Sequence, residues 1–161
     1  MKKVGLIVFF ALVTYACSVS SIYHDEDKAI IVANSFLKAL INEDYDKAYS
    51  TFLSDRLKEN VKLERFKSDL KDSQKIRGHL KKAVFDSYQP VPGQRAIQLY
   101  YNVTHDKIGA VPYHLVLEGD GKAGYTIIVL DIGNQMQYPP NIKFIGVKKI
   151  KKDRDIEVGS E

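Results

Sequence analysis

The apolar residues between positions 25 and 57 recur at the spacing of helices that bury one face. Positions i, i+3, i+4 and i+7 carry the first apolar set, which comprises Ala29, Val32, Ala33, Phe36, Leu37 and Leu40. Asp25 stands where a helix N-cap is needed, and Glu26 and Asp27 follow it, where the helix dipole favours negative charge. The pattern therefore predicts a first helix over residues 25–41.

Two further helical segments follow. Asn42 or Asp44 can cap the second, whose apolar face would comprise Tyr45, Ala48, Tyr49, Phe52 and Leu53. Ser54 then begins another turn. A third long helix is predicted over residues 62–77, with Gly78 as its terminator and with Leu63, Phe66 and Leu70 on its buried side. Because each helix has one apolar face, the helices must pack on one another or on a common surface.

From Gly78 onward the apolar residues alternate with polar ones, which is the pattern of β-strands. The clearest strand has one face formed by Ile97, Leu99, Tyr101 and Val103. A strand before it has Ala83 and Phe85 on one face, and a strand after it has a face formed by Val111, Tyr113, Leu115 and Leu117. Turn residues separate these strands at positions 90–93, 105–109 and 118–124.

The last predicted strands complete the fold class. Residues 125–132 are apolar on both sides, so we expect this fourth strand to be central or covered. Residues 141–150 are expected to form a fifth strand at an edge, guarded by lysines. Helices followed by antiparallel strands indicate an α+β fold, with N-terminal helices packed on a curved antiparallel sheet of four or five strands. We expect one domain over residues 25–150 and a disordered tail over residues 151–161.

The first 16 residues have the pattern of an export signal. Lys2 and Lys3 precede an uncharged apolar run over residues 4–16, which is shorter than the ~20 residues that a membrane-spanning helix needs. The single cysteine of the chain, Cys17, comes next, and residues 14–18 (TYACS) resemble the lipobox of bacterial lipoproteins. That resemblance implies cleavage before Cys17, a lipid such as palmitate on its sulfur, and a tether over residues 17–24.

A lipidated Cys17 would hold the exported domain at a membrane, facing the periplasm or the cell surface. Ser18 after the cysteine resembles the pattern of outer-membrane sorting in bacteria that have two membranes. The alternative is conventional cleavage nearby, which would release a soluble protein. Since no second cysteine is present in the sequence to form a disulfide, the domain would be stabilised by its core alone.

Charge and histidine spacing argue against several classes of partner. The formal net charge of +4 falls to +2 once Lys2 and Lys3 leave with the leader, which is too small a bias to indicate nucleic acid. The four histidines do not have the spacing of metal ligands; they are His24, His79, His105 and His114. We therefore predict no metal and no cofactor.

Several segments resemble one superfamily of small domains. Residues 33–40, 44–49 and 63–66, together with Gly78, look like the opening of the cone-shaped nuclear transport factor two-like domains, which are also called ketosteroid-isomerase-like or cystatin-like. Residues 119–132 resemble the final strand pair of that fold, so the resemblance covers residues 25–133. It implies a pocket enclosed by the cone. The tryptophan that usually follows the last hairpin is missing, and Tyr125 stands near its place.

The resemblance suggests where catalysis would occur if the domain is an enzyme. The ketosteroid isomerase pattern uses a carboxylate base with tyrosine and protonated acid groups as oxyanion donors. Asp131 continues the predicted face of Tyr125, Ile127 and Val129, and a carboxylate buried in a pocket is a usable base. Tyr101 and Tyr113 would then lie near Asp131. The alternative is that Asp131, at a strand end, faces water or caps a turn.

No catalytic pattern dominates the sequence, and this favours a binding function. We expect an exported, lipid-anchored small domain of the bacterial cell envelope that binds a ligand or a partner protein. One alternative is a small pocket enzyme of lyase or isomerase type that uses Asp131 with Tyr101 or Tyr113. Another is an accessory subunit of an envelope secretion complex.

Overall fold

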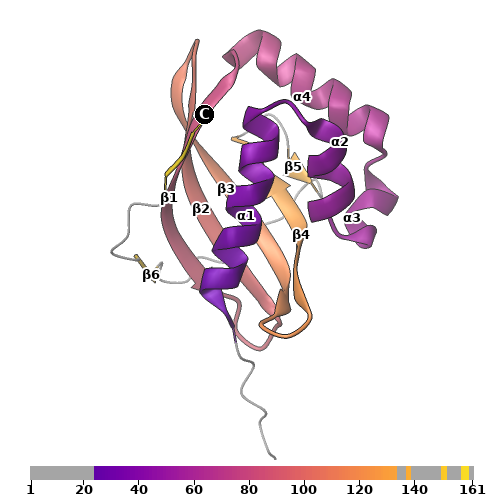
Figure 1. Cartoon of the computed structure of the whole chain (residues 1–161), viewed down its shortest axis with the longest axis vertical. Coiled ribbons are helices and arrows are strands. Elements are labelled where there is room, and N and C mark those ends of the chain that lie inside the picture. Colours follow the sequence, from indigo (N-terminus) through magenta and orange to yellow (C-terminus); the bar gives the residue numbers. More distant parts are fainter. Residues whose placement is uncertain (1–23, 134–136, 139–149, 152–156, 160–161) are drawn as a thin grey trace, which may run out of the picture.

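The structure, a computed structural model, describes residues 24–133, 137–138, 150–151 and 157–159. Within this part of the chain, helices come first and strands follow, which confirms the α+β fold (Figure 1). The predicted signal peptide 1–16, Cys17 and the tether apart from His24 lie outside the described residues. Residues 141–149 of the predicted fifth strand also lie outside them.

The first two helical segments begin at aspartate caps. α1 (Glu26–Ile41) starts where the Asp25 side chain accepts a hydrogen bond from the Lys28 backbone N–H at 3.1 Å. The second segment comprises α2 (Tyr45–Lys47) and a π-helical turn, η1 (Ala48–Phe52). Asp44 caps this segment by accepting from the Lys47 N–H at 3.2 Å, which decides between the two predicted caps.

Two more helices complete the helical part. α3 (Asp55–Asn60) begins at Ser54, whose hydroxyl accepts from the Leu57 N–H. α4 (Leu63–Arg77) ends at Gly78, which has a φ of +85°, the left-handed conformation that glycine adopts without strain. None of the helices in the described ranges is long and apolar enough to cross a membrane.

Four long antiparallel strands form the curved sheet in their order along the chain. They are β1 (Leu80–Pro90), β2 (Ala96–His105), β3 (Gly109–Asp120) and β4 (Gly124–Asp131). Short strands extend the edges: β5 (Gln137–Tyr138) pairs with β4, whereas β6 (Ile150–Lys151) and β7 (Glu157–Gly159) pair with β1. The strands β1 to β3 begin and end close to the predicted turns.

The expectation of a disordered tail from residue 151 is wrong for the part of the tail that is described. Lys151 pairs with Ser87, and Glu157–Gly159 pairs with Lys82, Ala83 and Val84 of β1. The outer edge of β1 offers unpaired backbone N–H and C=O groups, which a short segment can satisfy by adding to the sheet. Three residues are too few to show a strand period in the sequence.

α1 lies across one face of the sheet, and the two together form the core (Figure 1). Phe36 and Leu37 of α1 are fully buried. The predicted inward face of β2 is confirmed, because each of its members is at most 1% exposed: Ile97, Leu99, Tyr101 and Val103. Phe85 of β1 packs edge-on against Tyr101 with ring centres 5.6 Å apart. Apolar side chains therefore fill the space between α1 and the sheet.

A β-bulge in β4 changes which residues face α1. Val116 pairs with Val129 and Leu117 pairs with Ile127, so Ile128 is an extra residue without a cross-strand partner. Because side chains alternate along a strand, one extra residue moves the following side chains to the opposite face. Ile127 accordingly belongs to the main core, whereas Val129 packs with Val116 on the other side of the sheet.

Packing of α1 on the sheet predicts a strong contrast between two positions of that helix. Replacing the fully buried Leu37 with Ala should lower the free energy of unfolding by about 2–5 kcal/mol, because it leaves a cavity in the core. The control is Ile31→Ala on the same helix, where the side chain is 63% exposed and the change should stay below about 0.5 kcal/mol. Urea unfolding measures both, and equal effects would contradict this packing.

Candidate functional site

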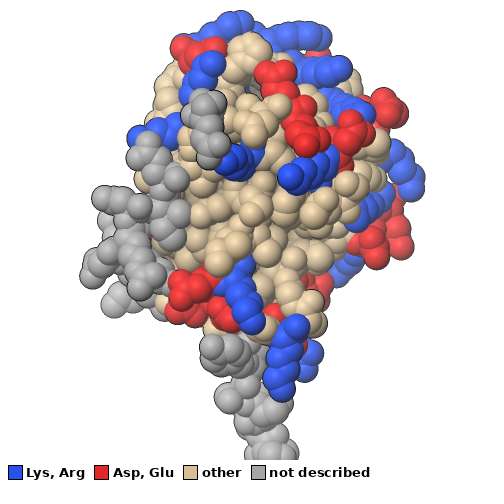
Figure 2. All heavy atoms as spheres, in the orientation of Figure 1, with Lys and Arg blue, Asp and Glu red and all other residues tan. Residues whose placement is uncertain are grey.

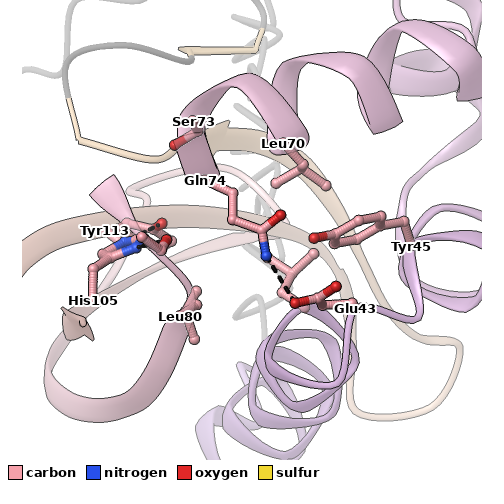
Figure 3. A pocket seen from close by; sticks show the side chains of 10 residues that line it. Glu43, Tyr45, Leu70, Ser73, Gln74, Leu80, His105 and Tyr113 are labelled. Carbon is pink, nitrogen blue, oxygen red and sulfur yellow. Dashed lines mark hydrogen bonds between the residues drawn. The ribbon is translucent and has the colours of Figure 1, made fainter. Parts of the chain in front are cut away.

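A small cavity lies beside α4, between the end of α1 and the start of the sheet (Figure 3). Its volume is about 30 Å³, which is room for about two water molecules. The lining comes from three parts of the chain, namely the region of α1 and α2, helix α4 with its C-cap, and strands β1 to β3. The lining residues are Leu40, Glu43, Tyr45, Leu70, Ser73, Gln74, Gly78, Leu80, His105 and Tyr113.

His105 and Tyr113 form a hydrogen-bonded pair in the cavity wall. The His105 Nε2 atom and the Tyr113 hydroxyl are 2.9 Å apart, and His105 Nδ1 lies 3.2 Å from the Gly78 carbonyl oxygen. A carbonyl oxygen only accepts, so Nδ1 carries the proton and Nε2 accepts from the Tyr113 hydroxyl. Both side chains are buried. The neighbouring strands β2 and β3 hold the pair in place.

Burial keeps this pair uncharged at neutral pH. Desolvation lowers the pKa of His105, the positive charge of Arg77 lowers it further, and the hydrogen bond to the Gly78 carbonyl opposes them. Desolvation also raises the pKa of Tyr113, against the effect of Arg77. Arg77 is itself buried and donates to the carbonyl oxygens of Ile132, at 2.7 Å, and Gly133.

Three polar side chains meet at the exposed side of the cavity. Glu43, in the turn after α1, accepts at Oε1 from Gln74 Nε2 of α4 at 2.7 Å. His79 Nδ1, between α4 and β1, lies 2.6 Å from the same carboxylate oxygen. Burial raises the pKa of the Tyr45 hydroxyl, and the nearby charge of Glu43 raises it further. The carboxylate of Glu43 therefore acts electrostatically on the cavity lining.

The structure does not assemble the predicted catalytic triplet. Tyr113 lines the cavity, but Tyr101 lies in the core, where its hydroxyl donates to Asn34 Oδ1 at 2.8 Å. Asp131 pairs with His114, between the inward-facing Tyr113 and Leu115 of β3. The prediction that Asp131 continues the face of Tyr125 is thus wrong, because the extra residue Ile128 moves it to the opposite face.

A second polar cluster lies on the face of Asp131. The His114 ring stacks on Tyr100 with centres 4.6 Å apart, and His114 Nε2 lies 3.0 Å from Gln98 Oε1. The Tyr100 hydroxyl donates to the same oxygen at 3.0 Å. Asp131 Oδ1 is buried without a hydrogen-bond partner. No group of three or more His, Cys, Asp or Glu side chains that could hold a metal ion occurs in the described ranges.

The sequence contained a signal for one of the residues that prediction missed. His105 has the same parity as Tyr101 and Val103, so it belongs to the inward face of its strand. A histidine on an otherwise apolar face needs a hydrogen-bond partner, and it therefore marks a polar position inside the fold. Glu43 and Gln74 gave no such signal, since both stand among polar residues.

Comparison with known proteins adds no relative. No protein-family model matches the chain, and no curated protein and no solved structure is significantly similar to it.

The lowered pKa of His105 predicts how stability depends on pH. In the unfolded chain His105 has its ordinary pKa of about 6.5, whereas in the folded protein its pKa is lower. Below neutral pH, unfolding therefore takes up a proton at this histidine. The free energy of unfolding should fall as the pH drops from about 7 toward 5. His105→Gln should flatten this dependence, whereas the control His79→Gln, at an exposed histidine, should retain it. Urea unfolding at each pH decides, and an unchanged slope in His105→Gln would contradict the burial of a neutral imidazole.

Proposed function

We propose that this chain is an exported, lipid-anchored binding domain of the bacterial cell envelope, and that the cavity beside α4 receives its ligand or one side chain of a partner protein. The observation that carries this proposal is the filled interior. Phe36, Leu37 and Leu99 are fully buried between α1 and the sheet, where a cone-shaped enzyme would hold its substrate. A cavity with room for about two water molecules suits a small group and not a whole substrate of drug size.

The separation of the candidate groups also favours binding over catalysis. Asp131 and Tyr113 lie on opposite faces of the sheet, so they cannot act on one substrate as base and oxyanion donor. His105 and Tyr113 satisfy each other by a hydrogen bond. The lyase or isomerase alternative thus loses the residues on which it depended.

The family and the anchor are parts of the same proposal. A relationship to the nuclear transport factor two-like superfamily is supported by the order of helices before antiparallel strands and by the curvature of the sheet (Figure 1). The lipid anchor is supported by the basic start, the apolar run and the position of Cys17. A domain held at the envelope by its N-terminus would present the cavity at the opposite end of α1 from its anchor.

The anchor predicts lipid labelling at a single sulfur. Cells that express the wild-type chain and are fed radiolabelled palmitate should incorporate label into it, and Cys17→Ser should incorporate none. Cys17 is the only cysteine in the sequence, so no other thiol can substitute for it. Equal labelling of the two chains would rule out the lipoprotein.

The binding function predicts a partner or ligand near the cavity. A photoreactive amino acid that replaces Gln74, at the exposed side of the cavity, should form a crosslinked product of defined mass in intact cells. The control places the same amino acid at Asp55, whose carboxylate side chain is 97% exposed and does not line the cavity. The same products from both positions, or none from Gln74, would contradict binding at this site.

A further inference from the structure

Helix α4 is fixed near both ends, and its C-terminal half lines the cavity through Leu70, Ser73 and Gln74. Near its start, Phe66 is fully buried and packs against the Tyr49 ring, with ring centres 5.7 Å apart. At its end, the buried Arg77 donates to the carbonyl oxygens of Ile132 and Gly133. No residue of α4 between these two is buried. Access to the cavity without local unfolding therefore depends on side chains and not on movement of the helix.

Gln74, in the last turn of α4, extends its side chain to the other wall of the cavity. Figure 3 shows it reaching from α4 toward Glu43, with the Tyr45 hydroxyl pointing toward the same place. Gln74 Nε2 donates to Glu43 Oε1 at 2.7 Å and also lies 2.6 Å from His79 Nδ1, and both contacts are exposed. A rotamer change at an exposed side chain takes picoseconds to nanoseconds, so these contacts can open without disturbing the fixed ends of α4.

The carboxylate of Glu43, which accepts the hydrogen bond from Gln74, gives the site its charge. Glu43 is the one formally charged residue in the cavity lining, because His105 is held neutral. Its Oε1 atom already accepts a hydrogen bond from the Gln74 amide and lies 2.6 Å from His79 Nδ1. Beyond it, Leu40, Leu70 and Leu80 supply apolar surface for a small alkyl group.

We propose that Gln74 is the gate of this cavity, and that the ligand is a small organic cation whose N–H donors replace the Gln74 amide at Glu43. The amide thus holds the carboxylate in the absence of ligand. An amidinium or ammonium group matches the carboxylate in charge and in hydrogen-bond donors, and the cavity of about 30 Å³ restricts the ligand to a small group. This inference rests on the proposed function, since it takes the same cavity as the binding site.

The gate is tested by the reactivity of a thiol placed in the cavity lining. In the full chain with Cys17→Ser, Ser73→Cys provides the only thiol, and its rate of reaction with a maleimide reports access. Adding Gln74→Ala should raise that rate at least about two- to tenfold, because the change removes the hydrogen bond to Glu43 together with the contact to His79. The control Asp72→Asn removes the 2.7 Å ion pair with Lys75 on the same helix and should leave the rate unchanged.

A second readout separates a side-chain gate from a loosened helix. Amide hydrogen exchange of α4 should be the same with and without Gln74→Ala, because Phe66 and Arg77 still hold the helix. An unchanged maleimide rate would overturn the gate. Exchange in α4 that accelerates as much as the labelling would also overturn it, since the helix itself would then be opening.

The ligand class is tested with two probes of the same shape and opposite charge. In the full chain with Cys17→Ser, acetamidinium should cause saturable shifts of the backbone NMR signals of Glu43 and His105. The dissociation constant obtained from these shifts should be lower when Gln74→Ala is added. Glu43→Gln should abolish them. Acetate should cause none. Equal or tighter binding of acetate, or no saturable binding of acetamidinium, would overturn the ligand class. Palmitate labelling and crosslinking would be unaffected, so failure here is distinct from failure of the proposed function.

Discussion

Packing of α1 against the curved sheet is the constraint on which the rest of the structure depends. The helix buries Phe36 and Leu37 completely, and the sheet meets it with an apolar face centred on Leu99 and Leu115. Because interiors are close-packed, this arrangement leaves little volume between helix and sheet. Polar groups that could bind a ligand are therefore found where the packing ends, beside α4, in a cavity that Glu43 and Gln74 border. On the face that carries α1, charged side chains lie at the top, along the side of α2 and α3 and at the bottom, around a largely uncharged centre (Figure 2).

Helices and long strands could be predicted because the sequence repeats their periods over many residues. α1 has eight buried residues at helical spacing and an aspartate cap, and β2 places Ile97, Leu99, Tyr101 and Val103 on one face by strict alternation. The bulge in β4 could not be predicted in this way. Ile127, Ile128 and Val129 are all apolar, so an extra residue among them leaves the pattern unchanged while it moves Asp131 to the other face. The extra residue Ile128 thus places Asp131, the candidate base, on the face of the sheet opposite Tyr113.

The cavity forms by contacts between distant parts of the chain, so the sequence predicts only part of its lining. The alternation of its strand predicts that Tyr113 lies on the inward face of the sheet. His105 lies on the same inward face, because it follows Tyr101 and Val103 at every second position of β2. Glu43 and Gln74 are 31 residues apart, and each stands in a polar segment that suits a solvent-exposed surface. Their meeting follows from how α4 crosses the end of α1, and this crossing is fixed by the buried contacts of Phe66 and Arg77. No local pattern records such a crossing.

Amide hydrogen exchange along α1 tests the central claim most directly. If the helix fills the inner face of the sheet, it cannot leave without exposing the core, so its central amides should exchange only through global unfolding. The free energy of exchange at Phe36, Leu37 and Ala39 should then equal that of β2 residues such as Leu99 and match the value from urea unfolding. Central α1 amides that exchange several kcal/mol more easily than those of β2 would show that the helix opens from an intact sheet, and would contradict the account.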